Sequence, residues 1–122
     1  MELNYFFDSY ALIELLKGNP KYIKYGEKIV TITIFNLVEV SYSVFKENGE
    51  IKAKEIYNKF KECVHEVDEE TMIEALKIKL EYKKRDLSYA DCIGYSFAKK
   101  HNLIFLTGDK EFEDLKYVEF VK

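Results

Sequence analysis

Tryptophan and glutamine are absent from this sequence of 122 residues, and arginine and proline each occur once. Only two cysteines are present, Cys63 and Cys92, too few for a disulfide framework and typical of reduced thiols in the cytosol. No apolar run approaches the length of a membrane span, and the first residues lack the pattern of a secretion signal. The sequence therefore predicts a cytoplasmic protein with no membrane partner.

Strand and helix patterns alternate along the whole chain. Hydrophobic residues make up 48% and charged residues 34%, which is ordinary for a folded protein, and the length suits a single domain over residues 1–122. Apolar or β-branched strand patterns occur at residues 3–7, 29–34, 63–67, 103–106 and 117–121. Helical spacing occupies the segments between them. This alternation predicts a three-layer α/β/α sandwich with a mostly parallel central sheet of four to five strands.

Four acidic residues lie where apolar strand patterns give way to a helix or a turn. They are Asp8, Glu39, Asp91 and Asp109. In open α/β sheets, ligands bind beyond the carboxyl ends of the strands. We therefore expect these four carboxylates to converge in one crevice.

Each of these acids also has an ordinary structural explanation. Asp8 is well placed to cap a helix, Asp109 fits a turn, and Ser88 with Asp91 has the spacing of a capping box. Glu39 lies on the polar side of its helix. Two unit charges about 5 Å apart repel by roughly 3 kcal/mol at an effective dielectric near 20, so four converging carboxylates would require a cation.

Oxygen ligands alone favour a hard cation, Mg²⁺ or Mn²⁺. Such an ion activates water and neutralises phosphate charge, which indicates a metal-dependent nuclease. Ser9 and Thr107 have hydroxyls placed to support the acidic residues. The net charge of −3 is smaller than the charge of the four acids, so the remaining chain need not repel RNA, and we expect weak, salt-sensitive binding.

Four stretches resemble the PIN-domain ribonucleases, and in length and order most closely the VapC-type toxins of toxin–antitoxin pairs. They are YFFDS at 5–9, NLVE at 36–39, LSYADCI at 87–93 and LTGDKEF at 106–112. The resemblance implies that Asp8, Glu39, Asp91 and Asp109 form an acidic metal site that cleaves single-stranded RNA through a metal-activated water. It also implies a homodimer and inhibition by a small antitoxin protein.

Three other functions share parts of this pattern. A haloacid-dehalogenase-like phosphatase needs a second Asp two residues after the first, where this chain has Tyr10. A response-regulator receiver places its phosphoacceptor after the third strand, where residues 67–70 read Val-Asp-Glu-Glu. A catalytically inactive PIN-like binding module would have no need of all four acids.

Aromatic and basic residues provide further candidates for contacts with partners. Aromatic residues make up 16% of the chain. Some flank the predicted crevice and suit a dimer interface, an antitoxin helix, a stacked RNA base or a partly buried core boundary. These are Tyr22, Tyr25, Tyr42 and Phe45. Candidate phosphate contacts, or simply solvated charges, are Lys83, Lys84, Arg85 and Lys110.

Overall fold

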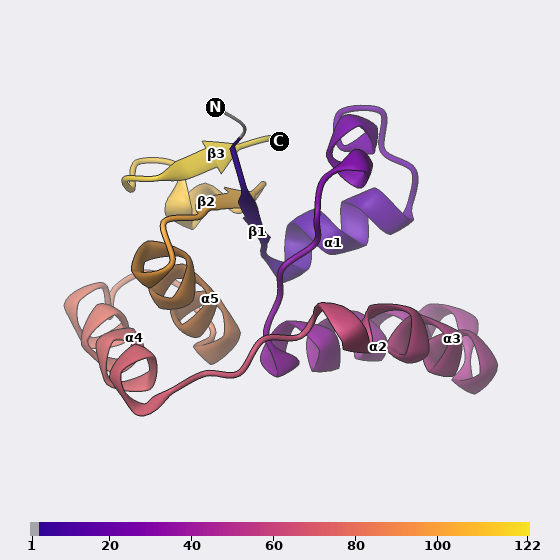
Figure 1. Cartoon of the computed structure of the whole chain (residues 1–122), viewed down its shortest axis with the longest axis horizontal. Helices are drawn as coiled ribbons and strands as arrows, with labels where there is room; N and C mark the ends of the chain where they lie inside the picture. The colour runs from indigo at the N-terminus through magenta and orange to yellow at the C-terminus, as the bar shows by residue number, and fades with distance from the viewer. Residues whose placement is uncertain (1–2) are drawn as a thin grey trace.

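A computed structural model describes residues 3–122 and has a small parallel sheet at its centre (Figure 1). Its strands, in sheet order, are β1 (Tyr5–Phe7), β2 (Ile104–Thr107) and β3 (Val118–Phe120). Phe6 lies opposite Phe105, and Leu106 lies opposite Glu119. Since parallel strands end at the same edge, the residues that follow β1 and β2 become neighbours.

The predicted count of four to five strands is wrong for regular strands, of which the described residues form three. Residues 29–34 contribute only a single bridge, between Ile32 and Val64, although the Phe7 amide donates to the Thr31 carbonyl at 3.0 Å. A helix begins directly afterwards, because the amide and hydroxyl of Thr33 both donate to the Asn36 side chain. The β-branched run is therefore cut short by a helix cap.

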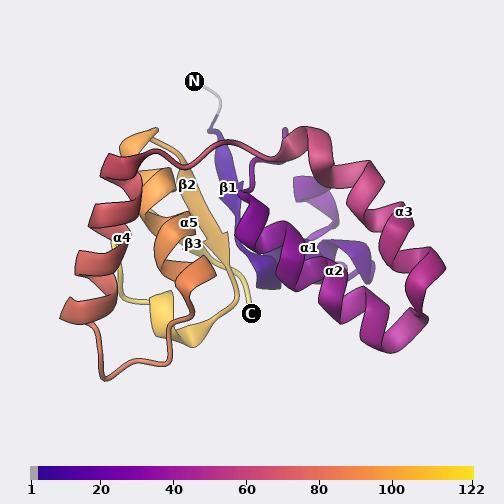
Figure 2. The same cartoon turned by 90° about the horizontal axis from the view of Figure 1, so that it is seen from below.

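Within residues 3–122, five helices form two layers, one on either side of the sheet, which Figure 2 shows from below. They are α1 (Ser9–Leu16), α2 (Ile34–Asn48), α3 (Glu50–Phe60), α4 (Glu69–Glu81) and α5 (Tyr89–Lys100). Short 3₁₀ turns are η1 (Ile23–Glu27), η2 (Lys61–Cys63) and η3 (Lys110–Phe112). The predicted α/β class, with helices on both faces of a parallel sheet, is confirmed.

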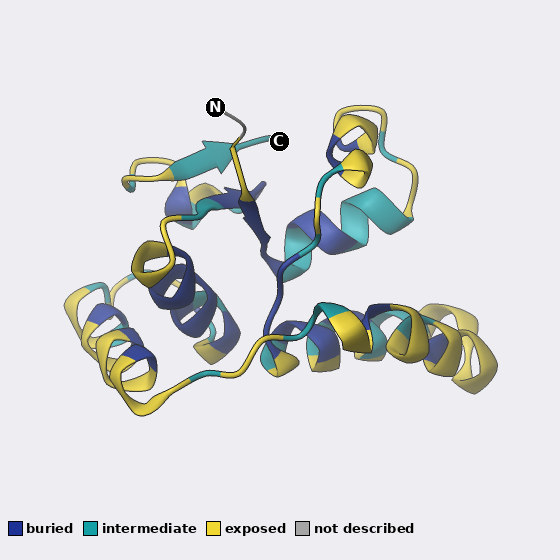
Figure 3. Cartoon of the chain, in the orientation of Figure 1, coloured by how far each residue is buried: buried dark blue, intermediate teal, exposed yellow. Residues whose placement is uncertain are grey.

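The strand side chains alternate between two apolar clusters, one on each face of the sheet. Phe7 and Leu106 pack with residues of α1 and α2, whereas Phe6 and Phe105 pack with residues of α4 and α5. Burial is concentrated on β1, on β2 and on the helix sides that face the sheet, whereas β3 is only partly buried (Figure 3). A Cβ at Gly94 would come within 2.7 Å of the Phe6 ring, so α5 approaches the sheet closely because it carries glycine there.

Exposed apolar side chains are most numerous on two of the helices. On α2 these are Ile34, Val38, Tyr42 and Phe45, and on α4 they are Met72, Ile73, Leu76 and Leu80. The side of α4 that packs inward instead carries Thr71, Ala75 and Ile78. Within residues 3–122, no helix is both long enough and apolar enough to cross a membrane.

Candidate functional site

Asp8 directly follows β1 and is buried, with contacts to the start of α1 and to the end of β2. Its amide donates to the Leu106 carbonyl at 3.2 Å, which keeps the residue in register with β2. One carboxylate oxygen accepts a hydrogen bond from the Ala11 amide at 2.7 Å, so Asp8 caps α1. The other oxygen accepts a hydrogen bond from the Thr107 hydroxyl.

The pKa of Asp8 is raised from its ordinary value to about 7, chiefly because the carboxyl group is removed from water. The hydrogen bonds from Thr107 and Ala11 favour the ionised form and lower the pKa, but they do not offset burial. The charges of Asp91 and Asp109 raise it further. Negative charge at Asp8 is therefore unfavourable without a positive partner.

Asp91 occupies the first turn of α5 in a reciprocal capping arrangement with Ser88. The Ser88 amide donates to the Asp91 carboxylate at 2.9 Å, and the Asp91 amide donates to the Ser88 hydroxyl at 3.1 Å. Burial raises the pKa of Asp91 to about 6, opposed by the hydrogen bond from the Ser88 amide. The charges of Asp109 and Glu39 raise it as well. Asp91 thus caps α5, and its negative charge is also repelled by the charges of Asp109 and Glu39.

Asp109 follows β2 after a tight turn. Its amide donates to the Thr107 hydroxyl at 3.0 Å, and its carboxylate accepts from the Glu111 amide at 3.0 Å. The turn requires glycine at position 108, because a Cβ there would lie 2.1 Å from a ring carbon of Tyr10. Thr107 therefore contacts both Asp8 and the backbone of Asp109.

Glu39 is held from α1 through a short chain of hydrogen bonds. The Ser9 hydroxyl donates to the Glu39 carboxylate at 2.5 Å, and the Asn36 amide nitrogen donates to the Ser9 oxygen at 3.2 Å. The Asn36 carbonyl oxygen is used by Thr33 at the start of α2. Asn36 is absent from the predicted site residues, although its position three residues after Thr33 has the spacing of a capping box.

The four acids influence one another through their charges, as the pKa values of Asp8 and Asp91 show. Within residues 3–122, none of them forms an ion pair with a lysine or arginine. In the same part of the chain, no three acidic, histidine or cysteine side chains are grouped closely enough to hold a metal ion. Convergence of all four carboxylates on one ion therefore stays a prediction.

Some of the residues suggested as contacts with RNA or protein partners instead make contacts within the protein. The Arg85 guanidinium donates to the Glu111 carbonyl at 2.7 Å and to both Asp114 oxygens at 2.7 and 2.9 Å. Arg85 thus ties the loop before α5 to η3. Tyr22 and Tyr25 are buried in the core and do not face a partner, whereas Tyr42 and Phe45 are exposed.

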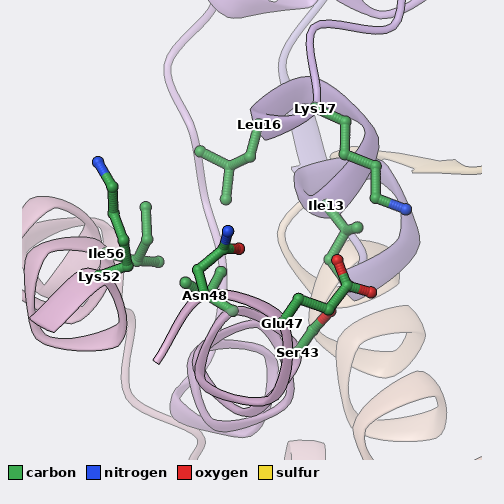
Figure 4. Close-up of a pocket in the computed structure, with 9 residues that line it drawn as sticks. Ile13, Leu16, Lys17, Ser43, Glu47, Asn48, Lys52 and Ile56 are labelled. Atoms are coloured by element: carbon green, nitrogen blue, oxygen red, sulfur yellow. The ribbon is translucent and has the colours of Figure 1, made fainter. Parts of the chain in front are cut away.

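A separate hollow of about 250 Å³ lies between α1, α2 and α3 (Figure 4). Ile13 and Leu16 of α1 face Ile56 of α3 across it, and Lys17 and Glu47 lie at its rim. None of the four acids lines this hollow. It is thus distinct from the edge of the sheet where Asp8 and Asp109 lie.

The sequence model of one protein family, the PIN domain, matches residues 5–117. No curated protein matches the chain by sequence.

Solved structures with a similar fold include several toxins and toxin–antitoxin complexes. A toxin–antitoxin complex from Klebsiella pneumoniae is 22% identical, with a TM-score of 0.75 over 95% of this chain and 96% of that one. VapC20 from Mycobacterium tuberculosis, a toxin that cleaves the sarcin-ricin loop, is 16% identical, with a TM-score of 0.77 over 98% and 100%. DNA-bound VapBC from Salmonella typhimurium is 19% identical, with a TM-score of 0.75 over 98% of both chains. At these identities the likeness concerns the fold.

Proposed function

Since the chain belongs to the PIN-domain family, we propose that it is a metal-dependent endoribonuclease and the toxin of a VapC-type toxin–antitoxin pair. The solved structures of similar fold support this proposal, because they include a toxin that cleaves the sarcin-ricin loop, a toxin–antitoxin complex and DNA-bound VapBC. The site consists of Asp8, Glu39, Asp91 and Asp109, with Ser9 and Thr107 in support.

One observation carries the proposal: buried negative charge without a cation from the protein. Burial and mutual repulsion raise the pKa values of Asp8 and Asp91, and none of the four acids pairs with a basic side chain within residues 3–122. A divalent cation from solution would supply the missing charge. The ligands are all oxygens, which suits Mg²⁺ or Mn²⁺, and Mg²⁺ binds through one or two carboxylates with its remaining positions filled by water.

The protein's own groups hold and orient these ligands. When bound, the cation supplies an acidified water and neutralises charge on the phosphodiester. Thr107 fixes the carboxylate of Asp8 and positions the Asp109 backbone. Ser9 fixes Glu39, and Asn36 fixes Ser9. Because these hydrogen bonds restrict the rotation of the Asp8 and Glu39 side chains, the two carboxylates are oriented before an ion or an RNA strand arrives.

The outer faces of α2 and α4 support the proposal of protein partners, a cognate antitoxin and a second copy of the chain in a homodimer. On α2 the exposed apolar residues Ile34, Val38 and Tyr42 recur at intervals of four, which places them along one side of the helix. Exposed apolar surface of this kind marks sites of protein association. We place the RNA substrate, the antitoxin and the activity in the cytoplasm.

The test is an RNA cleavage assay on the purified protein with Mg²⁺, with Mn²⁺ or with EDTA. We expect cleavage only with a metal, and a loss of at least about 100-fold in Asp91→Asn. Asparagine keeps an oxygen for the Ser88 amide, so the helix cap survives. Asp86→Asn, on the exposed loop before α5, is the matched control and should cleave like the unaltered protein. Cleavage in EDTA, or full activity in Asp91→Asn, would contradict the proposal.

A further inference from the structure

Tyr89 projects from the protein surface two residues before Asp91. It is the first residue of α5, and 62% of it is exposed, although Leu87, two residues earlier, and Ala90, the next residue, are buried. Single exposed aromatic rings are common on protein surfaces, but this one lies in the first turn of α5, which also holds Asp91. The position of Tyr89 therefore raises the question of which ligand lies against its ring.

A lysine from the neighbouring helix is held beside this ring. The Lys79 ammonium lies 4.7 Å from the centroid of the Tyr89 ring and donates to the Leu87 carbonyl at 2.7 Å. This hydrogen bond fixes the ammonium at the end of α4, so the ring and the positive charge form a defined pair. The ammonium lies over the ring in a cation–π contact, and the exposed remainder of the ring is left for a ligand.

The pair lies close to the acidic residues. Lys79 and Asp91 bind the two ends of one peptide group: the Lys79 ammonium donates to the Leu87 carbonyl at 2.7 Å, and the Ser88 amide donates to the Asp91 carboxylate at 2.9 Å. The cation and the acid are thus separated by the single peptide that leads into α5. A strand whose phosphate is held at the acids would pass near the Tyr89 ring.

A single-stranded nucleic acid matches this chemistry. Bases stack on exposed aromatic rings without regard to sequence, and a nearby cation attracts the backbone phosphate. We propose that Tyr89 and Lys79 form a platform on which a nucleobase of single-stranded RNA stacks beside the acidic residues. This inference rests on the proposed nuclease function and assigns the subsite that holds the RNA strand.

Fluorescence tests the platform directly, because the chain contains no tryptophan and a single introduced one reports alone. Tyr89→Trp is compared with Tyr117→Trp, both in an Asp8→Asn background that prevents cleavage. Tyr117 is also 62% exposed but lies beside Ala98 and Ile104, near the far end of α5 and the start of β2. A single-stranded RNA of mixed sequence, with Mg²⁺, should quench Tyr89→Trp saturably and leave Tyr117→Trp unchanged.

Kinetics give a second measurement. Tyr89→Leu should raise the KM for single-stranded RNA about 5- to 100-fold, the loss of one stacked base, while kcat changes little. Tyr89→Phe should restore the KM, because the ring and not the hydroxyl binds the base. Lys79→Gln should raise the KM less than Tyr89→Leu, and Tyr117→Leu should not change it. Thermal unfolding of each variant confirms that it folds.

The two proposals fail in different ways. If the unaltered protein cleaves RNA while Tyr89→Leu keeps its KM and Tyr89→Trp is not quenched, the platform is wrong and the nuclease function stands. If Tyr89→Trp is quenched but no metal supports cleavage, the chain binds RNA at the platform and the nuclease function is wrong. Equal quenching of both tryptophan variants would also overturn the platform, since stacking would then lack a defined position.

Discussion

Asp8 and Asp68 cap two helices in nearly the same way but in different surroundings. Asp8 accepts the Ala11 amide at 2.7 Å at the start of α1, and Asp68 accepts the Thr71 amide at 2.8 Å at the start of α4. Asp8 is buried, and its pKa is raised to about 7. Asp68 is exposed and pairs with Lys100, and that hydrogen bond holds its pKa below the usual range.

The difference shows that capping geometry alone does not distinguish a structural aspartate from a functional one. Both caps satisfy a backbone amide at the start of a helix. Only Asp68 has a lysine to neutralise it, whereas Asp8 faces the charges of Asp91 and Asp109. Under the proposed function, the buried acid surrounded by other acids is a candidate ligand for a cation from solution, whereas the exposed acid is neutralised by its own lysine.

The largest expected effect separates the two aspartates by activity. Asp8→Asn should lower RNA cleavage by at least about 100-fold, because a proposed metal ligand loses its charge. Asp68→Asn should cleave like the unaltered protein. Initial rates at saturating metal provide the measurement, and circular dichroism confirms that both variants fold. Similar rates for the two variants would remove the functional distinction between the caps.

Stability without metal should respond to pH with opposite signs at the two caps. The raised pKa of Asp8 means that the folded chain binds more protons than the unfolded chain between pH 4 and 7, so stability in EDTA falls as pH rises. A shift of the pKa from 3.8 to about 7 corresponds to a loss of at most roughly 4 kcal/mol in the free energy of unfolding as the pH rises through this range. Asp91 adds to this slope, since its pKa is also raised.

Denaturant unfolding at several pH values measures this slope. Asp8→Asn should flatten it between pH 4 and 7. Asp68→Asn should leave it unchanged, because the lowered pKa of Asp68 contributes stability that is lost only as pH falls below its ordinary value of 3.8. If the stability of the metal-free protein instead rises from pH 4 to 7, then groups of the protein itself must stabilise the negative charge of the buried Asp8 carboxylate.

A smaller effect concerns the hydroxyl beside each cap. Thr107→Val removes the donor to Asp8 and the acceptor for the Asp109 amide, and it should lower cleavage about 10-fold. Thr71→Val, at the cap of α4, is the matched control and should leave cleavage unchanged. Equal losses in both variants would indicate a general effect of burying valine in place of threonine.

The smallest effect is expected at the ion pair of Lys100 with Asp68. Lys100→Met should lower the unfolding temperature slightly, and the difference should disappear at high salt, because exposed pairs are weak and screened. Cleavage should not change. A large loss of stability that persists in high salt would mean that Lys100 contributes through packing.

The sequence pattern predicted most elements because apolar periodicity and caps act locally. The helix ends at Gly49 and the start at Ser88 follow such signals. Residues 29–34 failed as a regular strand because Thr33 caps α2, a competing local interaction that β-branched composition does not reveal. On α4 the apolar residues mark the helix correctly, but the small residues Thr71 and Ala75 face the core.

The candidate site could be predicted only in part. Strand ends identified Asp8 and Asp109, since parallel strands end at one edge. The tie from Asn36 through Ser9 to Glu39 depends on how α1 packs against α2, which no local pattern specifies. The engagement of Arg85 with Asp114 likewise depends on a contact between residues 29 positions apart.

The hydrogen bond from Thr107 to Asp8 joins residues 99 positions apart in the chain. A ribosome releases the N-terminal part of a protein first, so Asp8 emerges long before β2 and Thr107 can pair with it. An unfinished copy lacks the neighbour that orients Asp8 and lacks Asp109 altogether. Under the proposed function, a copy can therefore cleave RNA only after the segment that carries Thr107 and Asp109 has been synthesised, and a shorter fragment is expected to be inactive.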